Sequence, residues 1–483
     1  MFQYLRARYC NKISLTACLM YFIVTQSVGA VSMCTAAMAV SIIFQFPFLW
    51  SCLAIGLTGT IYTALGGLRG VVWTDSMQAI VTIFAPTTII IKILYDSQSG
   101  IFNIRPLNDF DFGNFAIDTT LDFTKDENTW TGLIGMLAVH IYRSGMDQMV
   151  VQRYLASRTL EEAKRTAGVG MVLLSLFAAT QTAVGLLLIY WFRDCDPQLS
   201  GGIKQLEQLL PFYVKKHLAQ FRGFSGLFLA GVVSAATSTI SSIINSQAAV
   251  LYTDVVSEYF TMTELQATRV TRLLGMKSGS IMTLYSAALP YMGSVTRIFL
   301  MVNSAVTGPF VGLFLMALIF PCVNSKGAGI ATLLAMTFQF WLLYNTITLE
   351  NRPKRISVTL NNCPVNQIAL TSQTSNGSFV LTRNVSQDVF ILLRLSSYWS
   401  NSISAILAIL FGLAISVITG GIRTQCKVLH LTSDVFLKFW RWMHLISPAE
   451  NTEQPQSEIP TRNENLSGLD YEELLKLTKE TEV

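Results

Sequence analysis

The feature that most constrains the fold is a series of ten long apolar stretches, each close to the roughly 20 residues that an α-helix needs to cross a bilayer. They occupy residues 13–43, 47–67, 71–95, 131–150, 166–192, 224–250, 270–292, 297–320, 325–347 and 395–420. With 51% hydrophobic and only 13% charged residues, the composition lies outside the usual range of soluble globular proteins. The sequence therefore predicts an all-α polytopic protein of the lipid bilayer with about ten transmembrane helices.

The distribution of basic residues predicts the orientation of these spans. Basic residues precede the first span and then follow every second span: Arg6, Arg8, Lys12, Arg69, Arg153, Arg158, Lys164, Arg165, Arg269, Arg272, Lys326, Arg423 and Lys427. Since basic residues concentrate in cytoplasmic loops, we expect both termini in the cytoplasm. We predict a cytoplasmic N-terminus at 1–12, a membrane domain at 13–420 and a partly disordered cytoplasmic tail at 421–483.

The loops on the opposite side have features of an extracellular face. The loop at about 348–394 contains two glycosylation sequons, at Asn376 and Asn384, which indicates a glycoprotein of the plasma membrane. Of the eight cysteines, Cys195 and Cys363 alone fall in the predicted extracellular loops. An oxidising environment allows a disulfide between them. Their position in loops does not establish the bond, so two free thiols remain the alternative.

The stretch from Gly226 to Val250 is apolar enough to cross a bilayer but carries nine hydroxyl or amide side chains. Within it, Ala235, Ser238 and Thr239 stand at i, i+3 and i+4, so one carbonyl and two hydroxyls can face one point if the helix is locally loosened. Hard cations such as sodium prefer such oxygen ligands. The alternative is close helix packing, in which serines and threonines bond back to the preceding turn.

The stretch at 131–150 contains ionisable residues, His140 and Arg143, with Asp147 near its end. Such residues are costly at membrane depth and indicate a functional site. Gly135 and Gly145 weaken the helix around them, and a broken helix exposes backbone groups that can bind a substrate or an ion. Together His140 and Arg143 favour an anion. The alternatives are that Arg143 extends to the cytoplasmic surface and that His140 is a packing residue.

Asp75 lies just inside the predicted membrane edge, in the run Trp-Thr-Asp-Ser-Met-Gln that ends at Gln78. Its carboxylate could attract cations that enter or leave on the cytoplasmic side. It could equally pair with Arg69. The sequence favours neither role over the other.

Motifs of nucleotide-binding loops, zinc proteases, nucleophile elbows and Cys-x-x-Cys pairs are absent from the sequence. We therefore expect no enzymatic activity and no cofactor, and an ion gradient as the source of energy. The formal net charge of +5 is spread along a mostly membrane-embedded chain. Without a basic patch that contains interleaved aromatic residues, it indicates no nucleic-acid partner.

Six motifs follow one another along the chain. They are Tyr4-Leu-Arg-Ala-Arg-Tyr, GGLRGVVWTDSMQ at 66–78, DQMVVQRYLASRTLEEAKR at 147–165, CDP at 195–197, LFLAGVVSAATSTISSIINS at 227–246 and GPFVGLFLMALIFPCVNSKGA at 308–328. In this order they resemble the solute:sodium symporter family, from residue 1 to about 420. The Ser238-Thr239 pair, the Trp-Thr-Asp run and the CDP loop are most similar to its branch of monocarboxylate, multivitamin and iodide symporters.

This resemblance implies a LeuT-like fold of two inverted five-helix repeats, with substrate and sodium bound near the middle of the membrane. It places Ala235, Ser238 and Thr239 on the family's sodium-ligand positions. It also places Asp75 on a carboxylate near the inner exit of sodium. The coupling ion is then sodium, with no other metal or cofactor implied.

The resemblance also implies three substrate-binding positions. His140 and Arg143 fall where sugar-transporting relatives have a sugar-contacting amide and a gating aromatic residue, and Met301 falls where they have a sugar-binding glutamine. The guanidinium of Arg143 offers charge-assisted bonds, which argues for a carboxylate over a neutral sugar. An arginine at the aromatic position puts the inner gate in doubt.

One departure from the family concerns the Tyr-Leu-x-x-Arg motif, which normally follows three earlier spans but here begins at Tyr4. By this comparison the outermost helix and the first two core helices are missing, including carbonyls expected to bind sodium. We expect a shortened product or an incomplete gene model.

The sequence as a whole predicts a sodium-coupled symporter of small organic anions, with monocarboxylates first among them, that works by alternating access. One alternative is transport of a vitamin such as biotin or pantothenate, or of iodide. The other is a non-transporting membrane protein that acts as an assembly partner or regulatory isoform.

Overall fold

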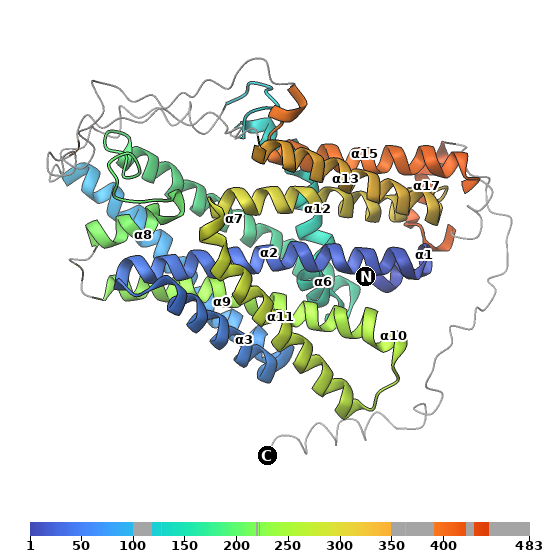
Figure 1. Cartoon of the computed structure of the whole chain (residues 1–483), viewed down its shortest axis with the longest axis horizontal. Helices are drawn as coiled ribbons and strands as arrows, with labels where there is room; N and C mark the ends of the chain where they lie inside the picture. Colours follow the sequence, from blue (N-terminus) through green and yellow to red (C-terminus); the bar gives the residue numbers. More distant parts are fainter. Residues whose placement is uncertain are drawn as a thin grey trace. The chain divides into compact units, whose positions relative to one another are not determined.

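The protein, in a computed structural model, is built from α-helices, and no strand occurs among the described residues (Figure 1). The structure describes residues 1–99, 118–126, 128–218, 221, 223–348, 363, 391–421 and 429–443. Its long helices are α2 (Asn11–Phe44), α3 (Phe48–Ser99), α7 (Leu160–Phe192), α9 (Phe224–Val250), α11 (Glu264–Met292), α12 (Val295–Ile319), α13 (Ser325–Thr348) and α15 (Ser397–Ile418). The predicted all-α class is confirmed.

Eight helical segments of the described chain are long and apolar enough to cross a membrane. They are Asn11–Phe44, Phe48–Gly67, Gly70–Ser99, Leu160–Phe192, Phe224–Tyr259, Val295–Ile319, Ser325–Thr346 and Ser397–Ile418. Each corresponds to one of the ten predicted stretches. The other two stretches differ. Residues 131–150 form short helical pieces, and α11 is long but not apolar enough to count among the eight segments.

A disulfide between Cys195 and Cys363, with 5.0 Å between their Cα atoms, indicates that α11 crosses the membrane as well. The bond puts both cysteines on one side of the membrane, so an even number of crossings must separate them. Three of the eight apolar segments lie between the two cysteines, and they belong to α9, α12 and α13. The fourth crossing is therefore α11, whose polar residues, such as Ser278 and Thr283, are buried inside the protein.

Helix α3 consists of two helices joined at Gly67. This residue has φ +57° and ψ −162°, a conformation that glycine adopts without strain. The kink separates the spans Phe48–Gly67 and Gly70–Ser99. It places Asp75 near the beginning of the second span. The side chain of Arg69, one of the two predicted partners of Asp75, lies outside the described residues.

Helices α12 and α15 pack closely because small residues line their contact. A Cβ atom added to Gly312 would lie 2.8 Å from the Cβ of Ala408 and 3.0 Å from the carbonyl oxygen of Ala405. A Cβ atom added to Gly308, one turn earlier, would lie still closer to the side chain of Ser404. Small residues at this spacing let two transmembrane helices approach each other, which replaces lipid contacts by van der Waals contacts within the protein.

The short helix α1 (Phe2–Arg8) is bonded to the C-terminal end of α12. Arg8 Nη2 donates to the carbonyl of Phe320 at 2.9 Å, and its Nε donates to that of Ala317 at 3.4 Å. The Tyr4 hydroxyl lies 3.0 Å from the same Ala317 carbonyl. Since the last carbonyls of a helix lack partners within the helix, these donors satisfy them. The Tyr-Leu-x-x-Arg motif thus joins α1 to α12.

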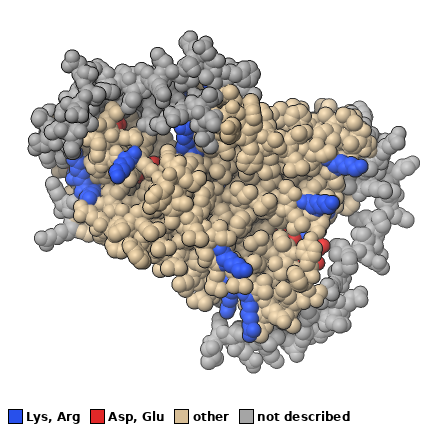
Figure 2. Space-filling model, in the orientation of Figure 1, with Lys and Arg blue, Asp and Glu red and all other residues tan. Residues whose placement is uncertain are grey.

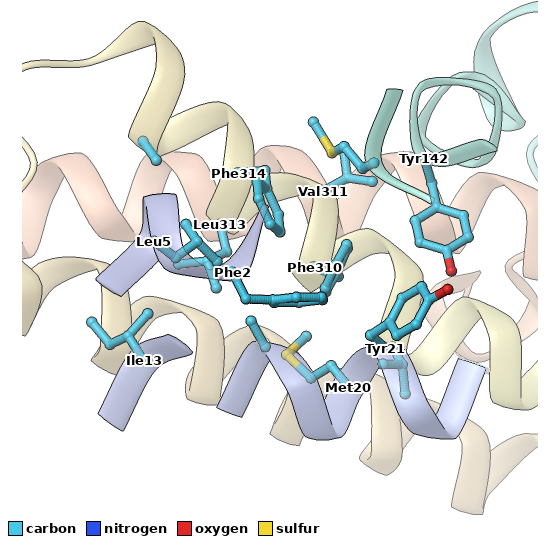
Figure 3. Close-up of a cluster of buried hydrophobic side chains, with 14 of the residues drawn as sticks. Phe2, Leu5, Ile13, Met20, Tyr21, Tyr142, Phe310, Val311, Leu313 and Phe314 are labelled. Carbon is cyan, nitrogen blue, oxygen red and sulfur yellow. The ribbon is translucent and has the colours of Figure 1, made fainter. Parts of the chain in front are cut away.

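A cluster of buried rings joins α1, α2 and α12 to the short helical pieces that follow residue 130 (Figure 3). Phe2, which is fully buried, packs edge-on against Tyr21 and Phe310 with ring centroids 5.7 and 6.4 Å apart. Tyr142 packs against Phe310 at 5.6 Å. Such edge-to-face pairs add about 1 kcal/mol each beyond the burial of their surface. The cluster therefore fixes Tyr142 beside α2 and α12.

The outer surface is mostly apolar. On the face shown in Figure 2, Lys and Arg side chains lie in small groups, with a broad uncharged area between the groups. Many large apolar side chains of α3 and α7 are exposed, among them Trp73 and Leu174. This pattern is typical of a surface that faces lipid. The chain divides into two compact units, Met1–Ser433 and Asp434–Val483, and α17 (Asp434–Trp442) is the helix described in the second.

Candidate functional site

Asp75 of α3 is bonded to two serines of α9. Ser238 Oγ donates to Asp75 Oδ1 at 2.6 Å, and Ser242 Oγ donates to Asp75 Oδ2 at 3.3 Å. The two serines stand at i and i+4, so they lie on one face of α9. The Asp75 side chain is only 15% exposed. A carboxylate and two hydroxyls are therefore gathered between two membrane helices.

Arg153 completes this cluster from the short helix α6 (Gln148–Leu155). Its Nη2 lies 2.7 Å from Asp75 Oδ2 and 3.1 Å from Ser242 Oγ. A carboxylate among apolar helices requires a partner of opposite charge, which explains the pair. The sequence offered Arg69 as the partner and treated Arg153 only as a marker of orientation. The signal that could have revealed Arg153 is its place in the motif DQMVVQR.

The predicted sodium ligands share a face but differ in their bonding. Ala235, Ser238 and Thr239 are all half-buried, on the same side of α9 as Ser242. The Thr239 hydroxyl donates back to the Ala235 carbonyl at 3.0 Å, as in ordinary helix packing. The helix is continuous here, so the loosening that would free this carbonyl does not occur in this conformation. Ser238, in contrast, points its hydroxyl at Asp75.

The cluster has the chemistry of a site for a hard cation. A serine that donates its proton to a carboxylate keeps two lone pairs on oxygen, so Ser238 can coordinate a cation while it remains bonded to Asp75. Hard cations prefer carboxylate, hydroxyl and carbonyl oxygens. Among the described residues, no group of three His, Cys, Asp or Glu could hold a metal ion. Carboxylate and hydroxyl oxygens such as those of Asp75, Ser238 and Ser242 suit sodium better than a transition metal, which prefers nitrogen or sulfur ligands.

The opposite face of α9 packs against α2 and α11 through a buried polar network. Gln247 Nε2 donates to Thr25 Oγ1 at 2.6 Å, and Gln26 Nε2 donates to Gln247 Oε1 at 3.0 Å. Ser278 of α11 also donates to Gln247 Oε1. Polar side chains hold membrane helices together in this way. The packing alternative therefore applies to this face of α9, and sodium binding at the other face stays a prediction.

Residues 131–155 form a broken helix rather than one span. Its pieces are η2 (Thr131–Gly135), α5 (Leu137–Ile141), η3 (Tyr142–Met146) and α6. The helix is interrupted at Asp147, whose backbone is extended. The Asp147 side chain caps α6, because it accepts a hydrogen bond from the Met149 amide at 3.1 Å. Gly135 and Gly145 were expected to weaken this helix, and the break itself falls at Asp147.

Asp147 is fully buried and its carboxylate is satisfied on both oxygens. Arg143 Nη1 donates to Oδ2 at 2.8 Å, and the Tyr21 hydroxyl lies 3.3 Å from Oδ1. Tyr21 also bonds to Ser246 of α9 at 2.9 Å. Because a buried unpaired carboxylate is strongly destabilising, these bonds fix the broken helix against α2 and α9.

The structure brings two of the three predicted substrate residues together. His140 in α5 and Arg143 in the adjoining η3 are both exposed and lie three residues apart. The Arg143 side chain is 45% exposed beyond its bond to Asp147. Met301 is buried and lines a cavity of about 20 Å³, room for a single water, whose lining does not include His140 or Arg143.

The remaining predicted sites lie in the loops. Cys195 and Cys363 form the disulfide described above. The sequons at Asn376 and Asn384 lie outside the described residues.

Comparison with known proteins relates this geometry to transporters. The mouse (Mus musculus) protein named sodium-coupled monocarboxylate transporter 2 is 28% identical over 425 residues, 87% of this chain and 67% of the mouse protein. The zebrafish (Danio rerio) protein of that name is 29% identical over 342 residues, 71% of this chain and 55% of its own length. A Drosophila melanogaster protein named putative sodium-dependent multivitamin transporter is 26% identical over 378 residues, 76% of this chain and 61% of that protein.

The fold also resembles a solved structure, that of a Na⁺-coupled sialic acid symporter in a substrate-bound outward-open state. The TM-score is 0.64 at 21% identity, over 86% of this chain and 76% of that one. This neighbour and the relatives are named as transporters and not as enzymes, as the sequence predicted for this chain. The chain spans between 55% and 67% of the length of the three relatives. Since the model of the Sodium:solute symporter family matches residues 1–335, well over half of the 483, the chain belongs to that family.

Proposed function

We propose that this protein is a sodium-coupled symporter of small organic anions, with monocarboxylates as its substrates. It would act in the plasma membrane with both termini in the cytoplasm. The observation that carries the proposal is the cluster of Asp75, Ser238 and Ser242, which gathers oxygen ligands between membrane helices. Two relatives named as sodium-coupled monocarboxylate transporters support the choice of ion and substrate.

Sodium would bind at the half-buried face of α9, with Ser238, Thr239 and the Ala235 carbonyl as ligands, and would leave past Asp75. In the present arrangement Arg153 neutralises Asp75. An ion that reaches Asp75 must compete with this guanidinium. Asp75 would therefore have two states, one paired with Arg153 and one paired with the ion. Sodium that binds one state better shifts the population toward it, and by linkage the anion that prefers the same state binds more tightly.

The anion would bind at His140 and Arg143. Arg143 uses Nη1 on Asp147, which leaves the Nε and Nη2 hydrogens for a carboxylate. Bonds between guanidinium and carboxylate are charge-assisted and stronger than neutral ones. The pairing with Asp147 also fixes the direction of the guanidinium, so less entropy is lost when the anion binds.

The experiment that tests the proposal is uptake of labelled lactate or pyruvate by the purified chain in proteoliposomes. With an inward sodium gradient we expect accumulation, and with potassium in place of sodium we expect none. Accumulation that is equal in both salts would contradict sodium coupling. Absence of uptake, in protein shown to be folded, would favour a non-transporting role.

A second candidate is transport of a larger anion such as biotin or pantothenate, which the Drosophila relative favours by its name. Competition separates the candidates, with iodide included as a small inorganic anion. If monocarboxylates are the substrates, unlabelled pyruvate should suppress uptake of labelled lactate at lower concentration than biotin, pantothenate or iodide does. The reverse order would assign the protein to vitamins or to iodide.

A further inference from the structure

The helix α17 (Asp434–Trp442) has sharply different faces. One stripe of residues at i, i+4 and i+7 is apolar and the stripe beside it is polar: Val435, Phe439 and Trp442 against Asp434, Lys438 and Arg441. Side chains at this spacing lie above one another along a helix. The next stripe also begins with an aromatic residue, Phe436. The apolar face is therefore broad and the polar face narrow.

The described residues of the second unit leave the apolar face of α17 exposed. The exposed fractions are 75% for Trp442, 73% for Val435 and 46% for Phe439. The rings of Phe439 and Trp442 lie 6.1 Å apart, so they shield each other only in part. Helices shorter than about 12 residues are marginal in water on their own. A nine-residue helix with an aromatic face of this kind needs an apolar environment to cover it.

We propose that α17 lies in the membrane–water interface, with its apolar face among the acyl chains and with Lys438 and Arg441 at anionic headgroups. Its length of about 14 Å is far too short to cross the membrane. Tryptophan and phenylalanine on one face, with basic residues on the other, are typical of helices that lie in the plane of the interface.

The chain itself keeps α17 close to lipid. Helix α15, which is apolar enough to span the membrane, ends at Ile418, and α17 begins at Asp434. At no more than about 3.6 Å per residue, the connection cannot carry α17 further than about 60 Å from the membrane. A lipid surface is thus always within reach at high effective concentration, whereas a protein partner would have to be recruited. Lys438 and Arg441 add attraction to anionic lipid.

The test places an environment-sensitive fluorescent amino acid at Val435 or, as the matched control, at Lys438 of the full chain. The protein is reconstituted in vesicles of phosphatidylcholine and phosphatidylserine. Lipids with nitroxide groups on their acyl chains should quench the probe at position 435 at least about threefold more strongly than the probe at position 438. Acrylamide, a quencher in water, should show the opposite preference.

Two other results would overturn the proposal. Strong quenching by acrylamide at both positions, with little quenching by the nitroxide lipids, would place α17 in water. A position 435 that is shielded from both quenchers would show that protein covers the apolar face. Because transport is not the readout, a chain that carries no anion can still meet the prediction.

A pair of substitutions tests the same surface in a second way. Phe439→Glu should abolish lipid quenching at position 435, whereas Phe439→Leu should retain it. Lys438→Glu should retain quenching in phosphatidylcholine alone and lose the gain that phosphatidylserine gives. If Phe439→Glu leaves quenching unchanged, the apolar stripe is not the membrane contact.

Discussion

Helix α12 and the second half of α3 are alike in hydropathy but differ in what they contact. The membrane segments Val295–Ile319 and Gly70–Ser99 have the same mean hydropathy in their most apolar part, yet 72% of that part is buried in the first and 17% in the second. In the first region glycines allow close backbone contact. In the second, fewer residues are buried, and a partly buried carboxylate, Asp75, faces α9. Hydropathy therefore indicates entry into the membrane but not whether a helix serves packing or a site.

The difference has a physical basis. A tightly packed pair of helices has no room for an ion and loses stability when a methyl group is added. A carboxylate between helices is costly unless it is paired, so it persists only where partners such as Arg153 and Ser238 approach it. Tight packing and ion chemistry thus occupy different parts of the same membrane domain.

The largest effect is expected where the packing is tightest. Gly312→Leu would force side-chain atoms into Ala405 and Ala408 and should reduce the free energy of unfolding by about 3 kcal/mol. Gly170→Leu on α7 is the control, because a Cβ there meets nothing within 4 Å. The temperature at which half the detergent-solubilised protein aggregates measures both. Equal losses in the two variants would remove the distinction between the regions.

The second effect concerns the more open region. Asp75→Asn removes the charge that faces Ser238 and Arg153 and should raise the sodium concentration for half-maximal uptake about 30-fold, a loss of about 2 kcal/mol. Asp118→Asn serves as the control, since Asp118 pairs with Lys125 away from these helices. Uptake against sodium concentration gives the values. An unchanged sodium curve in Asp75→Asn would exclude Asp75 from the ion path.

A smaller effect is expected from one hydroxyl. Ser238→Ala removes the 2.6 Å bond to Asp75 and a cation ligand, which should raise the half-maximal sodium concentration about tenfold. Ser280→Ala on α11 is a matched control, because that exposed hydroxyl bonds only to the Met276 carbonyl of its own helix. If the two variants share one sodium curve, Ser238 is a packing residue.

The smallest effect concerns pH. Burial lowers the pKa of His217 to about 4, with a further contribution from the charge of Lys216, and Asp96 and Lys92 also act on it. Unfolded histidine has a pKa of about 6.5. Between these pH values the unfolded chain binds more protons than the folded chain. The contribution of His217 to stability is therefore complete above pH 6.5 and is lost as the pH drops toward 4. Because solvent screens the partly exposed His217, we expect the free energy of unfolding to fall by about 1 kcal/mol.

His217→Phe should flatten this part of the pH profile, because the ring contacts with Tyr213 and Trp191 can remain while the titrating group is gone. Melting temperatures of both proteins between pH 7 and pH 4 measure the difference. Parallel profiles would mean that another group is responsible.

The sequence predicted the helices well because hydropathy is a local property. The stretch 13–43 corresponds to Asn11–Phe44, and 395–420 corresponds to Ser397–Ile418. The partner of Asp75 could not be predicted in the same way, since Arg153 lies 78 residues further along the chain. Their contact depends on how α6 packs, which no local pattern contains.

The candidate site was predicted in its residue types more than in its bonds. The hydroxyl-rich face of α9 was expected, and its spacing was sufficient to place Ser238 and Thr239 side by side. Which hydroxyl bonds back to the helix and which reaches Asp75 depends on the neighbouring α3. Likewise, Arg143 was expected either to extend to the membrane surface or to bind an anion. Instead it pairs with Asp147, a carboxylate that is buried beside the Tyr21 hydroxyl of α2 and needs a partner of opposite charge.

The disulfide between Cys195 and Cys363 sets an order of events during synthesis. The two cysteines are 168 residues apart, and α9, α11, α12 and α13 lie between them. At ribosomal rates of roughly 5–20 residues per second, Cys195 is made roughly 10 to 30 s before its partner. During that interval four helices must enter the membrane while one thiol stays reduced and unpaired. The bond can therefore form only when the helices between the two cysteines have inserted so that both thiols lie on the same side of the membrane.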